Sequence, residues 1–246
     1  MIKIEQELFI KKITLNHDEI QKQNKYPFNI PLIKNLQELY LEKPVTFLIG
    51  ENGVGKSTFI EALAVACGLN AEGGTENFMF STRETPYELS NYIEIDNFQR
   101  RVETKFFLRA ESFYNLASEI EKLRVSGYGT KSLHSVSHGE SFLQLIENRF
   151  TPNGLYILDE PEAALSPSRQ LTLLYLINDL AKKGSQFIIA THSPILISYI
   201  NGQILDLNND FKKITYEETE LYQLYKMYLD NPSAVQAKLF IEDEDY

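Results

Sequence analysis

The sequence predicts an α/β fold in which helices cover both faces of a mostly parallel sheet. Short apolar runs of strand length alternate with segments of helical periodicity along the 246-residue chain. A glycine-rich loop joins one of these runs to a helix, and two further runs end in polar or charged side chains, as expected at the carboxyl ends of parallel strands. Hydrophobic residues make up 43% of the chain, enough to fill a sizeable core.

The first half of the chain contains four predicted strands and two predicted helices. Alternation of apolar and polar residues predicts an opening strand, and a short fully apolar run predicts a buried one. A helix follows the glycine-rich loop and ends at Gly68, a natural stop signal. The predicted strands are residues 2–14, 45–49, 92–95 and 104–108, and the predicted helices are residues 56–67 and 112–123.

The second half continues the alternation of strands and helices. Between two short buried strands lies a helix that Ser166 caps, Pro167 opens and Gly184 closes. An Asn-Asn-Asp turn then predicts a hairpin, and two short helices finish the chain. The predicted strands are residues 155–158, 186–190, 204–207 and 213–216, with the turn at residues 208–210.

Composition limits the classes of partner and compartment. The formal net charge of −10 argues against a surface that broadly neutralises nucleic-acid phosphates. Cys67 is the only cysteine, so no disulfide or thiolate metal cluster forms within one chain, and we expect it to fill the core. The opening residues lack a secretory h-region, and no apolar stretch is long enough to span a bilayer. We therefore expect a cytoplasmic protein without a membrane segment.

The glycine-rich stretch GENGVGKST, residues 50–58, fits the phosphate-binding P-loop pattern and lies between a predicted strand and a predicted helix, as that motif requires. Its glycines let backbone N–H groups converge on phosphate oxygens at the positive end of the helix. Lys56 is expected at the β- and γ-phosphates of ATP, and the Ser57 hydroxyl at Mg²⁺. The predicted ATP-binding residues of this loop are Asn52, Gly53, Val54, Gly55, Lys56, Ser57 and Thr58.

Two other strand ends carry candidate catalytic residues. Asp159 and Glu160 follow a buried strand, and we expect Asp159 to hold Mg²⁺ while Glu160 polarises the attacking water. His192 follows another strand within ATHS and is expected to donate a hydrogen bond to the γ-phosphate. A lone histidine there would more often be an ordinary core residue, and it is the neighbouring motifs that favour the catalytic role.

The stretch SHGES, residues 137–141, begins a predicted helix. Ser137 and Glu140 form a capping box, and the apolar residues that follow have helical spacing. Neither observation explains Gly139, a poor helix former placed inside the first turn, where it would let an anion approach the positive end of the helix. The buried face is predicted to consist of Phe142, Leu143, Leu145, Ile146 and Phe150.

The ordered set GENGVGKST, SHGES, LYILDEPEAALS and ATHS resembles an ABC-type ATPase head. Within that superfamily the chain looks closer to the branch of chromosome-structure and repair ATPases, and FFLRAESFYNLA resembles stand-alone bacterial ATPases. The resemblance implies an α/β P-loop NTPase fold with a mostly parallel, ABC-ATPase-like sheet, flanking helices, an N-terminal antiparallel β part and a small helical lobe. It implies one domain over residues 1–246, with the lobe at about residues 70–150.

The resemblance also implies shared active sites. Ser137, Gly139 and Glu140 would contact ATP bound to the P-loop of a second protomer, in an ATP-dependent head-to-tail homodimer. The glutamine that such heads place near Mg²⁺ is absent from residues 108–113. Glu111 is expected to take either the metal or water role or an ordinary buried ion pair with Arg109.

An aromatic side chain often stacks on adenine in such heads. Tyr26 or Phe28, upstream of the P-loop, would serve, although packing in the core or a turn is the more frequent use of such residues.

We expect Mg²⁺-dependent ATP binding and hydrolysis that drives a conformational change in an unidentified partner process, nucleic-acid-related or defence-related. The partner is a protein or a nucleic acid. One alternative is an ATP-clamped scaffold with slow turnover, and a less favoured one is the motor subunit of an ABC transporter.

Overall fold

The computed structural model describes residues 7–71, 73–74, 85–96, 101–111, 113 and 138–240. Its centre is a six-stranded sheet with the strand order β5-β6-β7-β3-β8-β9. The first five strands are parallel, and β9 pairs antiparallel with β8 at one edge. The bounds are β3 Val45–Ile49, β5 Thr104–Arg109, β6 Gly154–Asp159, β7 Gln186–Ala190, β8 Gln203–Asp206 and β9 Lys212–Ile214. The predicted α/β fold is confirmed.

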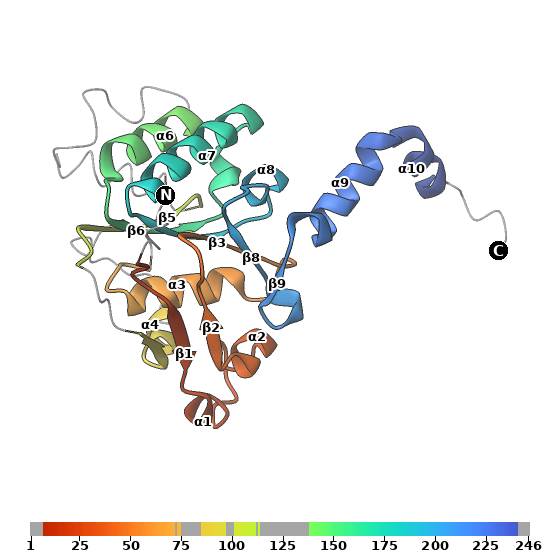
Figure 1. The fold of residues 1–246 in the computed structure, drawn as a ribbon. Coiled ribbons are helices and arrows are strands. Elements are labelled where there is room, and N and C mark those ends of the chain that lie inside the picture. The colour runs from red at the N-terminus through yellow and green to blue at the C-terminus, as the bar shows by residue number, and fades with distance from the viewer. Residues whose placement is uncertain are drawn as a thin grey trace, which may run out of the picture.

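A second, three-stranded antiparallel sheet has the order β2-β1-β4. Helix α3 (Lys56–Ala66) lies between this sheet and the six-stranded one (Figure 1). The three strands are β1 Lys12–Leu15, β2 Glu38–Tyr40 and β4 Ile93–Ile95, and the neighbouring short helices are α1 His17–Ile20, α2 Pro31–Asn35 and α4 Thr85–Ser90. An antiparallel β part near the N-terminus was expected.

The opposite face of the six-stranded sheet is covered by α6 (His138–Arg149), α7 (Pro167–Lys182) and α8 (Pro194–Ile197) (Figure 1). Alternate strand residues face the two layers: Leu155 and Ile157 of β6 pack in the α3 layer, whereas Tyr156 and Leu158 pack in the α6 and α7 layer. The predicted buried face of α6 is confirmed, because Phe142, Leu143, Leu145, Ile146 and Phe150 are all buried.

The last two helices, α9 (Glu220–Asp230) and α10 (Pro232–Leu239), project away from the body of the domain (Figure 1). Their exposed large hydrophobic residues are Leu224, Tyr225, Met227, Tyr228, Leu229 and Leu239. Among the described residues, no helix is both long and apolar enough to cross a membrane.

Several element predictions need correction. The opening strand, predicted over residues 2–14, is only Lys12–Leu15 among residues 7–15, because the Ile10 backbone bonds to the Gln186 side chain instead of a neighbouring strand. Ser166 is the N-cap residue of α7, but its side chain makes no capping hydrogen bond and contacts the Ser168 hydroxyl. The predicted helix at residues 112–123, apart from Phe113, lies outside the described residues.

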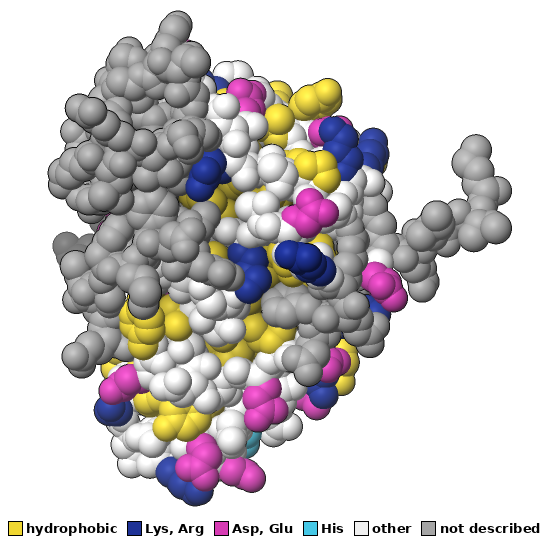
Figure 2. Space-filling model, turned by 90° about the vertical axis from the view of Figure 1, so that its left-hand side faces the viewer, with side chains coloured by type: hydrophobic (Ala, Val, Ile, Leu, Met, Phe, Trp, Pro, Cys, Tyr) yellow, Lys and Arg dark blue, Asp and Glu magenta, His cyan; other side chains and the backbone are white. Residues whose placement is uncertain are grey.

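Cys67 is buried, as expected for core filling, and burial raises the pKa of its thiol to about 12. The face shown in Figure 2 carries both basic and acidic side chains over the described part of the surface.

Candidate functional site

The P-loop lies at the carboxyl end of β3 and leads directly into α3. Gly53 and Gly55 have φ angles of 84° and 108°, a left-handed backbone that side-chain-bearing residues rarely adopt. A Cβ on Gly55 would lie 3.0 Å from the Ile30 side chain, so the loop also packs tightly against the segment before it. On the opposite side of the loop, the Asn208 side chain accepts a hydrogen bond of 3.0 Å from the Glu51 N–H and thereby anchors the loop to the segment after β8.

The Lys56 side chain lies inside this loop and bonds to its backbone. Its ammonium donates hydrogen bonds of 2.8 Å and 2.9 Å to the carbonyls of Gly50 and Glu51. The residue is only 4% exposed. Burial lowers the pKa of Lys56, while the carboxylates of Glu160 and Asp159 oppose that shift. A buried cation amid backbone groups is suited to an anionic ligand, such as a phosphate.

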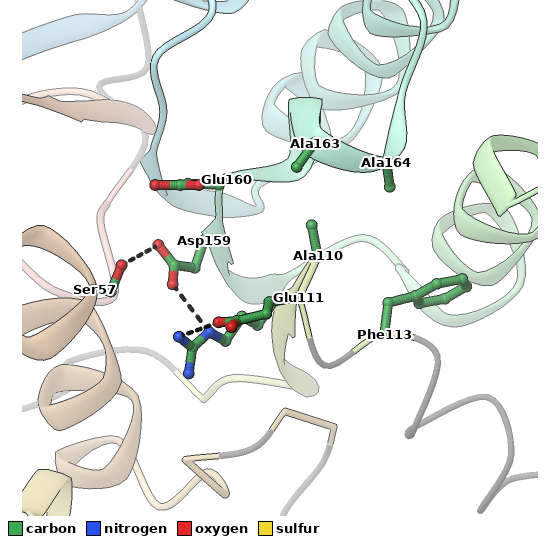
Figure 3. A pocket seen from close by; sticks show the side chains of 9 residues that line it. Ser57, Ala110, Glu111, Phe113, Asp159, Glu160, Ala163 and Ala164 are labelled. Atoms are coloured by element: carbon green, nitrogen blue, oxygen red, sulfur yellow. Dashed lines mark hydrogen bonds and ion pairs between the residues drawn. The ribbon is translucent and has the colours of Figure 1, made fainter. Parts of the chain in front are cut away.

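Ser57 and Asp159 meet beside the loop. The Ser57 hydroxyl donates a hydrogen bond of 3.3 Å to Asp159 Oδ1, and both side chains line a cavity of about 790 Å³ (Figure 3). Burial raises the pKa of Asp159 to about 7, although Arg109 opposes this rise. A hydroxyl and a carboxylate are hard oxygen ligands, so this pair fits Mg²⁺.

Among the described residues, no group of three or more His, Cys, Asp or Glu side chains is arranged to hold a metal ion.

Glu160 follows Asp159 in a left-handed conformation, with φ 48° and ψ 50°. Such a backbone is strained for a residue other than glycine, and strain of this kind is concentrated at functional sites. The Glu160 N–H donates to the Ala190 carbonyl at 2.9 Å, which fixes the end of β6 against β7. Both carboxylates, of Asp159 and Glu160, extend toward the side on which Ser57 lies (Figure 3).

His192 stands beside Glu160 at the end of β7. Its Nε2 lies 3.8 Å from Glu160 Oε1, too far for a hydrogen bond, and has no hydrogen-bond partner among the described residues. Burial, together with Lys56, lowers the pKa of His192. The His192 backbone N–H donates to the Glu162 carboxylate, which positions this residue without occupying its ring.

Arg109 lies next to the cavity and contacts three carboxylates. Its guanidinium is 2.6 Å from Glu61, 2.6 Å from Glu111 and 3.5 Å from Asp159. The sequence-based alternative of an Arg109–Glu111 ion pair is therefore present, although the Glu111 side chain is 75% exposed rather than buried. Glu61 was missed. The available signal was its spacing, since it lies four residues after Ser57 on the same helix face.

The start of α6 packs against the turn Pro161–Ala164, which follows Glu160. Neither Gly139 nor Glu140 lines the cavity of Ser57 and Asp159, or the cavity of about 310 Å³ beside Gly50 and His192. Gly139 has a packing role within its own chain, because a Cβ there would lie 2.8 Å from the Ala164 carbonyl. Glu140 is half-exposed, 3.9 Å from Arg169. Ser137, with its predicted capping role, lies outside the described residues.

Of the remaining predicted loop residues, Asn52 and Gly53 are exposed, and Val54 and Thr58 are half-buried. Of the two aromatic candidates, Phe28 is buried and packs edge-to-face on Tyr92 at 5.2 Å. Tyr26 is 56% exposed, and its hydroxyl lies 2.8 Å from the Thr58 hydroxyl. Tyr26 is therefore the aromatic side chain that remains available to a ligand at this loop.

Known proteins resemble the chain over most of its length. A Bacillus cereus protein named "Putative ABC transporter ATP-binding protein" is 26% identical over 88% of this chain, which spans only 43% of that relative. An "Uncharacterized ABC transporter ATP-binding protein" of Haemophilus influenzae is 26% identical, over 73% of this chain and 76% of its own. A solved structure described as "An inward-facing conformation of a putative metal-chelate type ABC transporter" aligns with a TM-score of 0.46 and 19% identity, over 78% of this chain and 81% of its own.

A family model matches residues 45–130 and 132–198, a region that contains the P-loop, Asp159, Glu160 and His192. The chain thus belongs to the family described as "AAA domain, putative AbiEii toxin, Type IV TA system" and is an ABC-type ATPase domain.

Proposed function

We propose that this protein binds ATP with Mg²⁺ and hydrolyses it to ADP and phosphate. The observation that carries the proposal is the meeting of a buried lysine, a hydroxyl–carboxylate pair and a second carboxylate at the carboxyl ends of β3 and β6. These residues are Lys56, Ser57, Asp159 and Glu160. Phosphoryl transfer needs mainly positioning and charge stabilisation, which such a small set of groups supplies.

The phosphates would bind in the loop of residues 50–58. In our proposal, Lys56 exchanges its hydrogen bonds to the Gly50 and Glu51 carbonyls for phosphate oxygens, and the N–H groups of the loop and of the first turn of α3 complete the cradle. Tyr26, exposed beside Thr58, is the candidate for stacking on adenine.

Ser57 and Asp159 are the residues that would hold Mg²⁺, with Glu111 as a further carboxylate on the same cavity. The ion would neutralise charge that develops on the phosphate oxygens. The Ser57 hydroxyl donates a hydrogen bond to Asp159 Oδ1, so the two oxygen atoms face each other.

Glu160 is the proposed general base. Its carboxylate is 43% exposed and therefore accessible to water, while its backbone is fixed by β7. His192, whose Nε2 lies 3.8 Å away without a hydrogen-bond partner among the described residues, would donate from that nitrogen to the terminal phosphate when it carries the proton there.

We further propose that each site is completed by a second copy of the chain, in a head-to-tail homodimer. Ser137, Gly139 and Glu140 would belong to the partner's site. The assignment rests on the resemblance of SHGES to the corresponding segment of ABC-type heads; within its own chain, Gly139 packs against Ala164. ATP-driven closure and reopening would then act on a protein or nucleic-acid partner. The alternative of a slow ATP clamp uses the same residues.

The experiment is Glu160→Gln, measured for phosphate release and for ATP binding. Glutamine keeps the shape of the side chain and removes the base, so we expect ATP binding within about twofold of wild type and turnover reduced by about 100-fold or more. Glu147→Gln, an exposed change on α6, is the matched control and should leave both unchanged. Turnover of Glu160→Gln within a few-fold of wild type would remove Glu160 from this role.

A further inference from the structure

The guanidinium of Arg109 lies among three carboxylates at the cavity lined by Ser57 and Asp159. Arg109, the last residue of β5, is 14% exposed at its side chain, and each of its three nitrogen atoms faces a different carboxylate. Nη1 contacts Glu61, Nη2 contacts Glu111, and Nε faces Asp159. A planar guanidinium has the fixed fork of donors that such a three-way arrangement requires.

Glu61 is the buried anchor of this arrangement. Its side chain is 8% exposed and 2.6 Å from Arg109, and it comes from α3, one turn after Ser57. The contact from Arg109 to Asp159 is longer, at 3.5 Å. The guanidinium is therefore held chiefly by Glu61 and Glu111, and it approaches Asp159 without forming a tight, closed pair with it.

The two oxygens of Asp159 thus have different environments. Oδ2 faces Arg109, and Oδ1 accepts the hydrogen bond from Ser57. Because a carboxylate is rigid and planar, holding Oδ2 on the β5 side directs Oδ1 toward the P-loop. Figure 3 shows the Asp159 carboxylate between these two contacts.

We propose that Arg109, anchored by Glu61, is a positioning residue for Asp159 and prepares this carboxylate for a divalent cation bound with nucleotide phosphates. The inference rests on the proposed function and adds two residues to it. Glu61 acts through Arg109 and does not itself contact the cation. Lysine at position 109 would supply the charge without the fork, so it would not restore the arrangement.

The test measures binding of a fluorescent N-methylanthraniloyl ATP to the full chain, once in Mg²⁺ and once in EDTA. Arg109→Lys should weaken binding in Mg²⁺ by about tenfold, as loss of a residue that orients a metal ligand does. Binding in EDTA should stay within about twofold, because the phosphate cradle is untouched. Glu61→Gln should also weaken binding in Mg²⁺ but not in EDTA, by a smaller factor of about threefold, since the amide still contacts Arg109.

The double variant Glu61→Gln with Arg109→Lys should bind no more weakly than Arg109→Lys alone, because Glu61 acts through Arg109. Glu88→Gln, which breaks the surface ion pair with Lys25, is the matched control and should change neither measurement. Should Arg109→Lys fail to fold, Glu61→Gln carries the test, since it keeps the shape of the buried side chain.

The positioning role would be overturned if Arg109→Lys lost equal affinity for the nucleotide in Mg²⁺ and in EDTA. It would also be overturned if the affinity losses of the two single variants added in the double variant. A wild-type chain that binds the nucleotide in neither buffer would instead overturn the proposed function. Wild-type binding that depends on Mg²⁺, combined with unaffected Arg109→Lys and Glu61→Gln variants, would refute this inference alone.

Discussion

The substitution Gly139→Ala tests whether close packing is the reason for a glycine at the start of α6. The added methyl group would lie 2.7 Å from Arg169 Nη1, 3.1 Å from Arg169 Cδ and 2.8 Å from the Ala164 carbonyl oxygen. The Arg169 side chain is partly exposed and can rotate away. The Ala164 carbonyl cannot, because it belongs to the 3₁₀ turn Pro161–Ala164 that follows Glu160.

The expected cost follows from these contacts. Forcing a methyl group into a filled space costs about 1–3 kcal/mol. Alanine recovers at most about 1 kcal/mol through its higher helix propensity, and this gain applies to a helix interior rather than to the first turn. We therefore expect Gly139→Ala to lower the free energy of unfolding by about 1–2 kcal/mol.

The assay is equilibrium unfolding in urea without nucleotide, followed by far-ultraviolet circular dichroism, so that no ligand contributes. Repeating it in an Arg169→Ala background removes two of the three close contacts and leaves the carbonyl. A cost of about 1 kcal/mol should persist there. If Gly139→Ala is as stable as wild type, packing does not require the glycine, and only the approach of a ligand would explain it.

Two further predictions concern the metal and the dimer. Glu111→Ala should raise the Mg²⁺ concentration needed for half-maximal turnover by about threefold or more if Glu111 is a further oxygen ligand, whereas an unchanged Mg²⁺ titration would leave it as an exposed partner of Arg109. Lys56→Ala and Ser137→Arg should each be inactive alone, but their mixture should recover about a quarter of wild-type turnover, because about half of the re-associated dimers are mixed and each of these has one intact site. An active Ser137→Arg protein would contradict shared sites.

Sequence predicts well those elements that are determined by residues within a few positions of one another. The P-loop, β7 and the buried face of α6 each follow from spacing or from turn chemistry within a few residues. The predicted extent of the opening strand was wrong, because the Gln186 side chain, far away in sequence, makes the backbone hydrogen bonds of Ile10. Local alternation does not reveal such a partner.

The contacts around the site show the same limit. Spacing from Ser57 places Glu61 on the same face of α3, but its contact with Arg109 at the end of β5 depends on tertiary packing, which spacing does not reveal. Whether Tyr26 or Phe28 stays exposed could not be chosen from sequence either, since both are aromatic and close together. Packing on Tyr92 buries Phe28 and leaves Tyr26 exposed.

The left-handed backbone of Glu160 places stability and turnover in opposition at one position. A side chain at φ 48° costs about 1–2 kcal/mol that glycine would not. Glycine there would relax the end of β6 and at the same time remove the proposed base. If Glu160 is the base, a screen for fold stability alone would favour glycine at this position and yield inactive chains, whereas a screen for hydrolysis would retain glutamate.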